Sequence, residues 1–250
     1  MIDYEKELNA EQYRVVMEEG GPLLVLAGAG SGKTRTLTYR VARLLESGVQ
    51  PDRILLATFT NKAARSMLGR VENILQSYTG KILGGTFHHI AHVILRSYAF
   101  RLGYKNNFTI LDSEDARQLI STCMAELKIN PKLTKFPRNN VIAEIISLTV
   151  NTQNTLEDIL QTRYPFFLHL FNEINQIALL YIHRKKDLSV MDFDDLLCNC
   201  RTLLTENPDL LNKYAGRFEH VLVDEYQDTN IIQADMVDLL ASGHKNLMVV

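Results

Sequence analysis

The stretch LLVLAGAGSGKTRTL, residues 23–37, decides the fold of this chain. An apolar run leads into a loop of small residues, and Lys33 and Thr34 then open a segment with helical character. The pattern G-x-x-x-x-G-K-[ST] is met at Gly32, Lys33 and Thr34, with Ala27 in place of the first glycine. A strand, a tight loop and a helix in this order place backbone N–H groups and the positive helix end around a phosphate. The stretch therefore predicts a nucleotide-binding loop.

Small side chains let this loop curl closely around a ligand. Lys33 can reach the β- and γ-phosphates, and the Thr34 hydroxyl can ligate Mg²⁺. A glycine-rich turn without a ligand is the alternative, and the strand–loop–helix context argues against it. The predicted cofactor-binding residues of the loop are Ala27, Gly28, Ala29, Gly30, Ser31, Gly32, Lys33 and Thr34.

A second segment, HVLVDEYQDTN at residues 220–230, supplies acidic residues directly after an apolar run. A strand here would deliver Asp224 and Glu225 to the carboxyl edge of a sheet, where ligands of α/β proteins bind. We expect Asp224 to hold Mg²⁺ through water and Glu225 to polarise an attacking water as general base. Two surface acids without a role are the alternative.

Apolar runs typical of buried parallel strands alternate with helical patterns at both ends of the chain. The predicted strands cover residues 22–26, 53–59, 81–87, 220–223 and 246–250. The predicted helices between them cover residues 8–19, 33–47 and 61–78, and a further helix starts near Ile231. Residues 1–88 and 216–250 are therefore expected to form one parallel α/β domain.

The middle of the chain, residues 89–215, is almost entirely helical in its hydrophobic period. A loop is expected at 128–140, and Pro208 and Gly216 are expected to interrupt the helical pattern within residues 205–218. The sequence thus predicts an α/β fold in which a P-loop NTPase sheet is interrupted by a mostly helical inserted subdomain.

The composition excludes several classes of protein. The 250 residues carry a net charge of −2, so any binding of nucleic acid must depend on a local groove and not on overall basicity. Three cysteines are too few for a disulfide framework, and no signal peptide or membrane-spanning run is visible, so we expect a cytoplasmic protein.

Several motifs in the same order give the chain a resemblance to the N-terminal half of superfamily 1 DNA helicases of the UvrD/Rep/PcrA type. The phosphate loop and the VDEYQDTN segment (223–230) are two of these motifs. The others are LNAEQ (8–12), TFTNKAARSM (58–67), GTFHHIAHVILR (85–96) and DFDDLL (192–197). Together they extend over nearly the whole chain and are highly specific.

The resemblance implies a RecA-like motor domain in an ATP-dependent 3′–5′ DNA helicase or translocase. It implies ATP and Mg²⁺ as cofactors, with Gln12 reading adenine, Arg35 beside the base or sugar, and Gln227 coupling the nucleotide and DNA sites. Lys33, Asp224, Glu225 and Gln227 form the implied catalytic set. The implied single-strand contacts, through stacking and phosphate binding, are Phe59, Thr60, Asn61, Thr86, Phe87 and His88.

Implied partners are single-stranded DNA, duplex–single-strand junctions and a second motor domain of the same parent chain, whereas the oligomeric state stays open. Ser66 and His89 depart from residues common in the family. The resemblance also implies a downstream segment with a γ-phosphate-sensing Gln and a second domain with arginine fingers, neither of which we expect within these 250 residues. Because such arginines supply up to about 10³–10⁵ in rate in related NTPases, we expect slow ATP hydrolysis by this chain alone.

Two other functions remain open from the sequence. The chain can be the motor portion of a recombination helicase–nuclease subunit, or a nucleotide-binding module without motor activity. A metal site at His88, His89 and His92 is a hypothesis that the sequence does not favour, because no further type of ligand accompanies the histidines.

Overall fold

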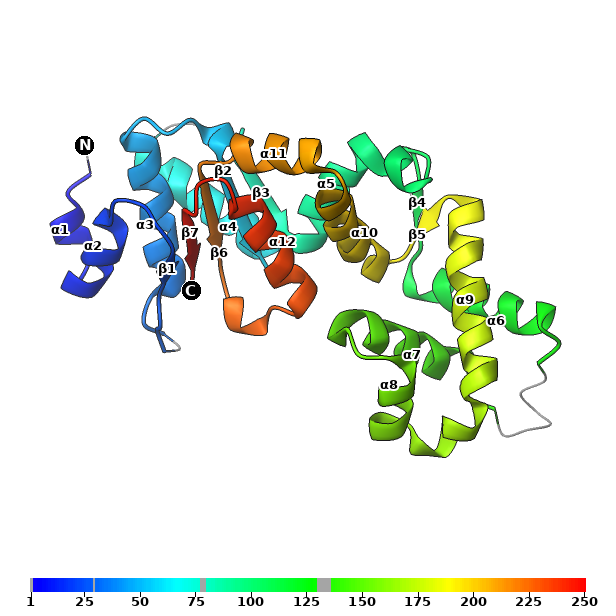
Figure 1. Ribbon diagram of the computed structural model, residues 1–250. Coiled ribbons are helices and arrows are strands. Elements are labelled where there is room, and N and C mark those ends of the chain that lie inside the picture. The colour runs from blue at the N-terminus through cyan, green and yellow to red at the C-terminus, as the bar shows by residue number, and fades with distance from the viewer. Residues whose placement is uncertain (1, 29, 77–79, 130–135) are drawn as a thin grey trace. The chain divides into compact units, whose positions relative to one another are not determined.

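The structure is a computed structural model that describes residues 2–28, 30–76, 80–129 and 136–250. The chain divides into two compact units (Figure 1). The sheet unit comprises Met1–Val93, Leu204–Thr229 and Gln233–Val250, and the helical unit comprises Ile94–Leu203 and Asn230–Ile232. The domain boundaries predicted at 88/89 and 215/216 stay predictions.

A parallel sheet forms the centre of the sheet unit, and the predicted α/β class is confirmed. Its strands lie in the order β1-β7-β6-β2-β3, and each neighbouring pair is parallel. The strands are β1 (Leu23–Leu24), β2 (Ile54–Thr58), β3 (Leu83–Thr86), β6 (His220–Val223) and β7 (Leu247–Val249).

Strand β6, which carries the acidic motif, lies inside the sheet between β7 and β2. All five residues of β2 are buried, as expected for a parallel strand covered on both faces. Ala57 pairs with Val223, and the next residue, Asp224, donates its backbone N–H to the Ala57 carbonyl at 3.0 Å. The sheet ladder therefore fixes the backbone at which the acidic pair begins.

Helices cover this sheet and enclose an apolar core. Leu37 and Val41 from α3 pack in one buried cluster with Leu56 of β2 and Leu222 of β6. The helices that lie wholly in the sheet unit are α1 (Tyr4–Glu7), α2 (Ala10–Met17), α3 (Lys33–Glu46), α4 (Asn61–Leu75) and α11 (Pro208–Arg217). Helices α5 (Phe87–Tyr98), α10 (Phe193–Glu206) and α12 (Ile231–Ala241) contribute residues to both units.

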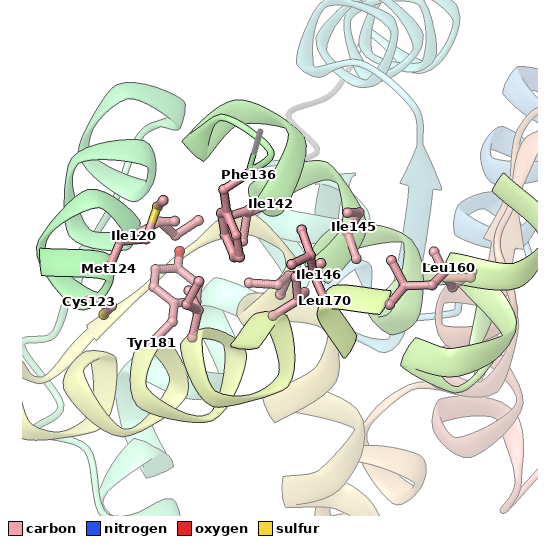
Figure 2. Packing of buried hydrophobic residues seen from close by; sticks show 13 residues of the cluster. Ile120, Cys123, Met124, Phe136, Ile142, Ile145, Ile146, Leu160, Leu170 and Tyr181 are labelled. Atoms are coloured by element: carbon pink, nitrogen blue, oxygen red, sulfur yellow. The ribbon is translucent and has the colours of Figure 1, made fainter. Parts of the chain in front are cut away.

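The helical unit has its own apolar core. Figure 2 shows Ile120, Ile142, Leu170 and Tyr181 converging from different helices. Its elements are η2 (Ala99–Leu102), β4 (Thr109–Ile110), α6 (Ser113–Glu126), α7 (Asn139–Thr152), α8 (Leu156–Arg163), η3 (Pro165–Leu170), α9 (Phe171–Leu188) and β5 (Val190–Met191). Within the described residues, no helix combines the length and apolar character needed to span a membrane.

Two local predictions were wrong. The first helix does not run from residue 8 to 19: Asn9 caps α2 in a reciprocal capping box with Gln12, and α1 ends before it. Residues 208–217 form α11, because Pro208 occupies the first turn, where its missing N–H is harmless, and Gly216 is tolerated near the helix end. The β4–β5 pair was not predicted, since two-residue strands leave no periodic signal.

A buried ion cluster lies within the helical unit. The Lys185 ammonium, with a side chain that is 4% exposed, lies 2.6 Å from Asp192 Oδ2 and 2.7 Å from Asp195 Oδ2. Tyr181 also donates its hydroxyl to Asp192 at 2.9 Å. Burial raises the pKa of Asp195 to about 6. One cation thus holds two carboxylates inside the unit.

Replacing Lys185 with methionine should therefore destabilise the protein by about 3–5 kcal/mol, because two buried carboxylates lose their counter-ion. Urea unfolding followed by circular dichroism measures the change in free energy. The matched control is Lys6→Met, which removes an exposed pair with Asp3 and should cost at most about 1 kcal/mol. Equal losses for the two variants would contradict the assignment.

Candidate active site

The loop between β1 and α3 contains a tight turn just before α3. Gly30 and Gly32 adopt left-handed backbone conformations with φ of 79° and 89°, which side chains other than glycine rarely accept. Ser31 closes the turn by donating its N–H and its hydroxyl to the Gly28 carbonyl at 3.2 and 2.7 Å. Helix α3 begins at Lys33. Ala29 lies outside the described residues.

The structure brings Lys33 of the loop to Glu225 of the acidic pair. Lys33 Nζ lies 2.8 Å from Glu225 Oε2, although 192 positions separate the two residues. Gln227 donates its side-chain amide to the same carboxylate oxygen. The hydrogen bond to Glu225 raises the pKa of Lys33, and the bonds from Lys33 and Gln227 lower the pKa of Glu225. Both partners are consequently charged at neutral pH.

Glu225 has an unusual backbone. Its φ of 54° and ψ of 45° lie in the left-handed region, which is disfavoured for a residue with a side chain. The short helix η4 (Tyr226–Asp228) follows at once, and the Tyr226 N–H donates to the Val250 carbonyl at 2.8 Å. Such strain is found at functional sites, where the surrounding structure maintains it.

Asp224 lies beside this pair but deeper in the protein. Its side chain is buried, and its Oδ1 atom has no hydrogen-bond partner in the part of the chain that the structure describes. Burial and the neighbouring Glu225 charge raise the pKa of Asp224, while the charge of Lys33 opposes that change. An unpartnered, buried carboxylate oxygen is costly unless a cation or donor satisfies it.

A cavity of about 880 Å³ joins the loop and the acidic segment. Its size is in the range of small-molecule sites. Its lining includes Gly30, Gly32, Lys33, Thr34, Arg35, Arg70, Glu225, Tyr226 and Gln227.

Gln12 and Arg35, expected near the base, lie beside the loop. Gln12 donates its amide to the Ser31 carbonyl at 3.0 Å, and its amide oxygen accepts the Asn9 N–H at 3.3 Å. Arg35 lies 2.9 Å from Glu7 Oε2 and over the ring of Tyr39 at 4.9 Å. Their roles toward a nucleotide stay predictions.

The expected stacking residue, Phe59, is 38% exposed just after β2. Its ring meets that of Phe87 edge to face, with 6.0 Å between centroids. Phe87 itself is buried, so in this structure its ring supports Phe59 and is not open to a ligand. The predicted DNA contact of Phe87 stays a prediction.

The other expected DNA contacts lie at two turns after neighbouring strands. Thr60 caps α4 by accepting the Ala63 N–H at 3.1 Å, and Asn61 is exposed in the first turn of that helix. At the end of β3, the Thr86 hydroxyl accepts the His89 N–H at 3.2 Å, and His88 is half-buried. Because β2 and β3 are parallel neighbours, both turns lie at the same end of the sheet, where the carboxyl ends of its strands meet.

The family model described as the UvrD/REP helicase N-terminal domain matches residues 8–250. The chain belongs to this family. The predicted relationship to UvrD/Rep/PcrA-type helicases is therefore confirmed, although the roles of individual residues are not tested by it.

Curated UvrD/REP relatives match almost the whole chain. The ATP-dependent DNA helicase PcrA of Staphylococcus epidermidis strain RP62A is 40% identical over 249 residues, 98% of this chain and 33% of the relative. The protein of the same name from Staphylococcus aureus strain Mu50 is 40% identical over 247 residues, 97% of this chain and 33% of the relative. The chain spans about a third of the length of these relatives.

Sequence reasoning missed two features of this UvrD/REP site. Arg70, on α4, lines the cavity with the phosphate loop. Asn9 accepts the Gln12 N–H at 2.8 Å and so anchors the start of α2. The asparagine could have been found as a helix-capping residue in LNAEQ, whereas Arg70 carries no local signal, because its proximity depends on how α4 packs.

Proposed function

We propose that this chain is the ATP-binding part of an ATP-dependent DNA helicase or translocase that couples ATP hydrolysis to 3′–5′ movement on single-stranded DNA. The observation that carries the proposal is the 2.8 Å approach of Lys33 to Glu225 within one cavity. The PcrA relatives are ATP-dependent DNA helicases by name, which supports the helicase part of this proposal.

In this proposal, the loop binds the triphosphate of ATP. The backbone N–H groups at the start of α3 and the Lys33 ammonium face the phosphates. Arg70 provides a further cation in the cavity, and Gln12, bonded to the loop, and Arg35, on the cavity wall, are proposed to contact the base or sugar. ATP binding then requires Lys33 to exchange Glu225 for phosphate oxygens.

The residues present fit a magnesium ion at this site. Thr34 supplies a hydroxyl on the cavity wall, and Asp224 supplies the buried Oδ1 that has no partner among the described residues. Mg²⁺ is usually held by one or two carboxylates together with substrate phosphates, so a cluster of acidic ligands is not required. Bound there, the ion would neutralise developing charge on the phosphates.

Glu225 is proposed as the general base. Both Lys33 and Gln227 donate to its Oε2 atom. When phosphate draws Lys33 away, the carboxylate gains a free lone pair with which it can orient water. Gln227, which already contacts this carboxylate, is positioned to sense that exchange and is proposed to couple it to DNA.

Single-stranded DNA is proposed to bind at the sheet edge formed by the turns after β2 and β3. Phe59 offers a ring face for stacking, and the buried Phe87 ring supports it. Thr60, Asn61, Thr86 and His88 complete the proposed site. We propose that duplex–single-strand junctions are the substrates and that a second motor domain completes the catalytic cleft.

Phe59→Ala should weaken single-stranded DNA binding by about 10- to 100-fold, since base–aromatic stacking contributes about 1–3 kcal/mol per base. Fluorescence anisotropy of a labelled oligonucleotide measures the affinity. Phe100→Ala removes a more exposed ring in the helical unit, 58% exposed, and should leave the affinity unchanged. If the two variants bind equally well, the stacking role of Phe59 is wrong.

The proposed activity is tested with the full-length protein that contains this chain. ATP turnover should rise on addition of single-stranded DNA, and a duplex with a 3′ tail should be unwound in preference to one with a 5′ tail. The 250-residue chain alone should turn over ATP slowly. DNA-independent turnover, or preference for the 5′ tail, would overturn the proposal or its direction.

A further inference from the structure

Three residues, beginning with the last residue of the acidic motif, belong to the helical unit, although the residues on both sides belong to the sheet unit. They are Asn230–Ile232. Asn230 donates its side-chain amide to Asn151 Oδ1 at 2.8 Å. Asn151 in turn donates its amide to Asp194 Oδ1 at 2.8 Å. The motif is thus connected by two side-chain hydrogen bonds to the last turn of α7 and the first turn of α10.

The chemistry of the partners fixes the direction of this relay. The Asp194 carboxylate only accepts hydrogen bonds, so the Asn151 nitrogen must face it and the Asn151 oxygen must face Asn230. Ser147, one turn earlier in α7, also accepts from the Asn151 nitrogen, at 3.0 Å through its carbonyl and 3.1 Å through its hydroxyl. Asn151 is therefore held in a single orientation, as a positioning residue must be.

Local hydrogen bonds hold the turn that leads from Glu225 to Asn230. The Asp228 N–H donates to the Glu225 carbonyl at 3.0 Å, and Thr229 donates both its N–H and its hydroxyl to the Tyr226 carbonyl at 3.0 and 2.8 Å. These bonds join the backbone of Glu225 and Tyr226 to Asp228 and Thr229, and Thr229 is the residue before Asn230.

We propose that Asn151 is a positioning residue that transmits nucleotide occupancy from Glu225, through Asn230, to α7 and to Asp194 of α10. The proposal rests on the proposed function, because it requires a nucleotide to draw Lys33 away from Glu225. When that ion pair breaks, the turn relaxes and the hydrogen bonds of Asn151 change with it.

Hydrogen–deuterium exchange of the 250-residue chain tests the relay, with and without Mg²⁺ and a non-hydrolysable ATP analogue. In the wild type, amides in residues 147–152 and 193–197 should change their exchange rate by about fivefold or more on nucleotide binding, the lower range of typical coupling between sites. A fluorescent ATP analogue, titrated in parallel, reports binding itself.

Two variants separate coupling from simple structural support. Asn151→Asp places a carboxylate against Asp194, so repulsion breaks the relay and the nucleotide-dependent change should vanish. The double variant Asn151→Asp with Asp194→Asn reverses the donor and acceptor and restores the hydrogen bonds to residues 230 and 194, although position 151 no longer donates to the Ser147 carbonyl. It should therefore restore at least half of the nucleotide-dependent change. Asn154→Asp makes the same substitution at an exposed asparagine nearby and should behave as wild type.

Each outcome decides between the proposals. If every variant binds nucleotide and Asn151→Asp keeps the wild-type exchange change, the relay is wrong and the proposed function stands. If the wild type binds nucleotide without any change in α7 or α10, the relay is again wrong. If the wild type binds no nucleotide, the proposed function is wrong, and the relay, which depends on it, is wrong as well. Asn151→Ala, which adds no charge, replaces Asn151→Asp if the latter does not fold.

Discussion

Replacing Glu225 with glutamine is expected to lower ATP turnover of the full-length protein by about 10²–10⁴-fold, the usual contribution of a positioned general base. Nucleotide affinity should be equal or tighter. Glutamine has the same shape, so it can occupy the same left-handed backbone position, but it cannot accept a proton and does not retain Lys33 as an ion-pair partner. Steady-state turnover and titration with a fluorescent ATP analogue measure the two effects separately.

Glu219→Gln is the matched control for this variant. It makes the same chemical change just before β6, where Glu219 forms an exposed pair with Arg53 at 3.1 Å. Exposed pairs contribute little, so turnover should stay within a factor of two or so of wild type. Normal turnover by Glu225→Gln would show that another group activates the water.

Lys33→Ala should reduce nucleotide affinity by about 10- to 100-fold, because hydrogen bonds to charged groups contribute about 1.5–3 kcal/mol. The bond to Glu225 raises the pKa of Lys33, so its ammonium is present throughout the neutral range and can bind phosphate. The same variant leaves Glu225 without its ion-pair partner inside the cavity, and the uncompensated carboxylate will further repel phosphate.

Lys6→Ala provides the comparison for nucleotide binding, because Lys6 pairs with Asp3 on the surface and does not line the cavity. Its affinity for the fluorescent analogue should equal that of wild type. An unchanged affinity in Lys33→Ala would mean that the loop does not bind phosphate through this lysine.

The sequence was sufficient to predict the parallel sheet and its relation to the motifs. Strands such as β2 are buried on both faces and therefore consist of a continuous apolar run. Such a run can be recognised in the sequence without knowing which distant residues it contacts. The acids after β6 follow from the same logic, since the end of a parallel strand marks the edge where ligands bind.

The interactions that tune the site could not be predicted in the same way. The hydrogen bonds of Lys33 and Gln227 to one oxygen of Glu225, and the left-handed backbone of Glu225, arise only after residues far apart in sequence meet. Arg70 and Asn151 illustrate the same limit, because an exposed helix position looks alike in sequence whether it faces solvent or a partner.

Isothermal titration calorimetry of the 250-residue chain with a non-hydrolysable ATP analogue, with Mg²⁺ present and then chelated, tests most directly whether the phosphate loop and the acidic pair form one site. We predict one nucleotide per chain and an affinity that falls by about tenfold or more without Mg²⁺, a loss of at least about 1.4 kcal/mol. The absence of saturable binding, or an affinity indifferent to Mg²⁺, would contradict the proposed nucleotide–magnesium site.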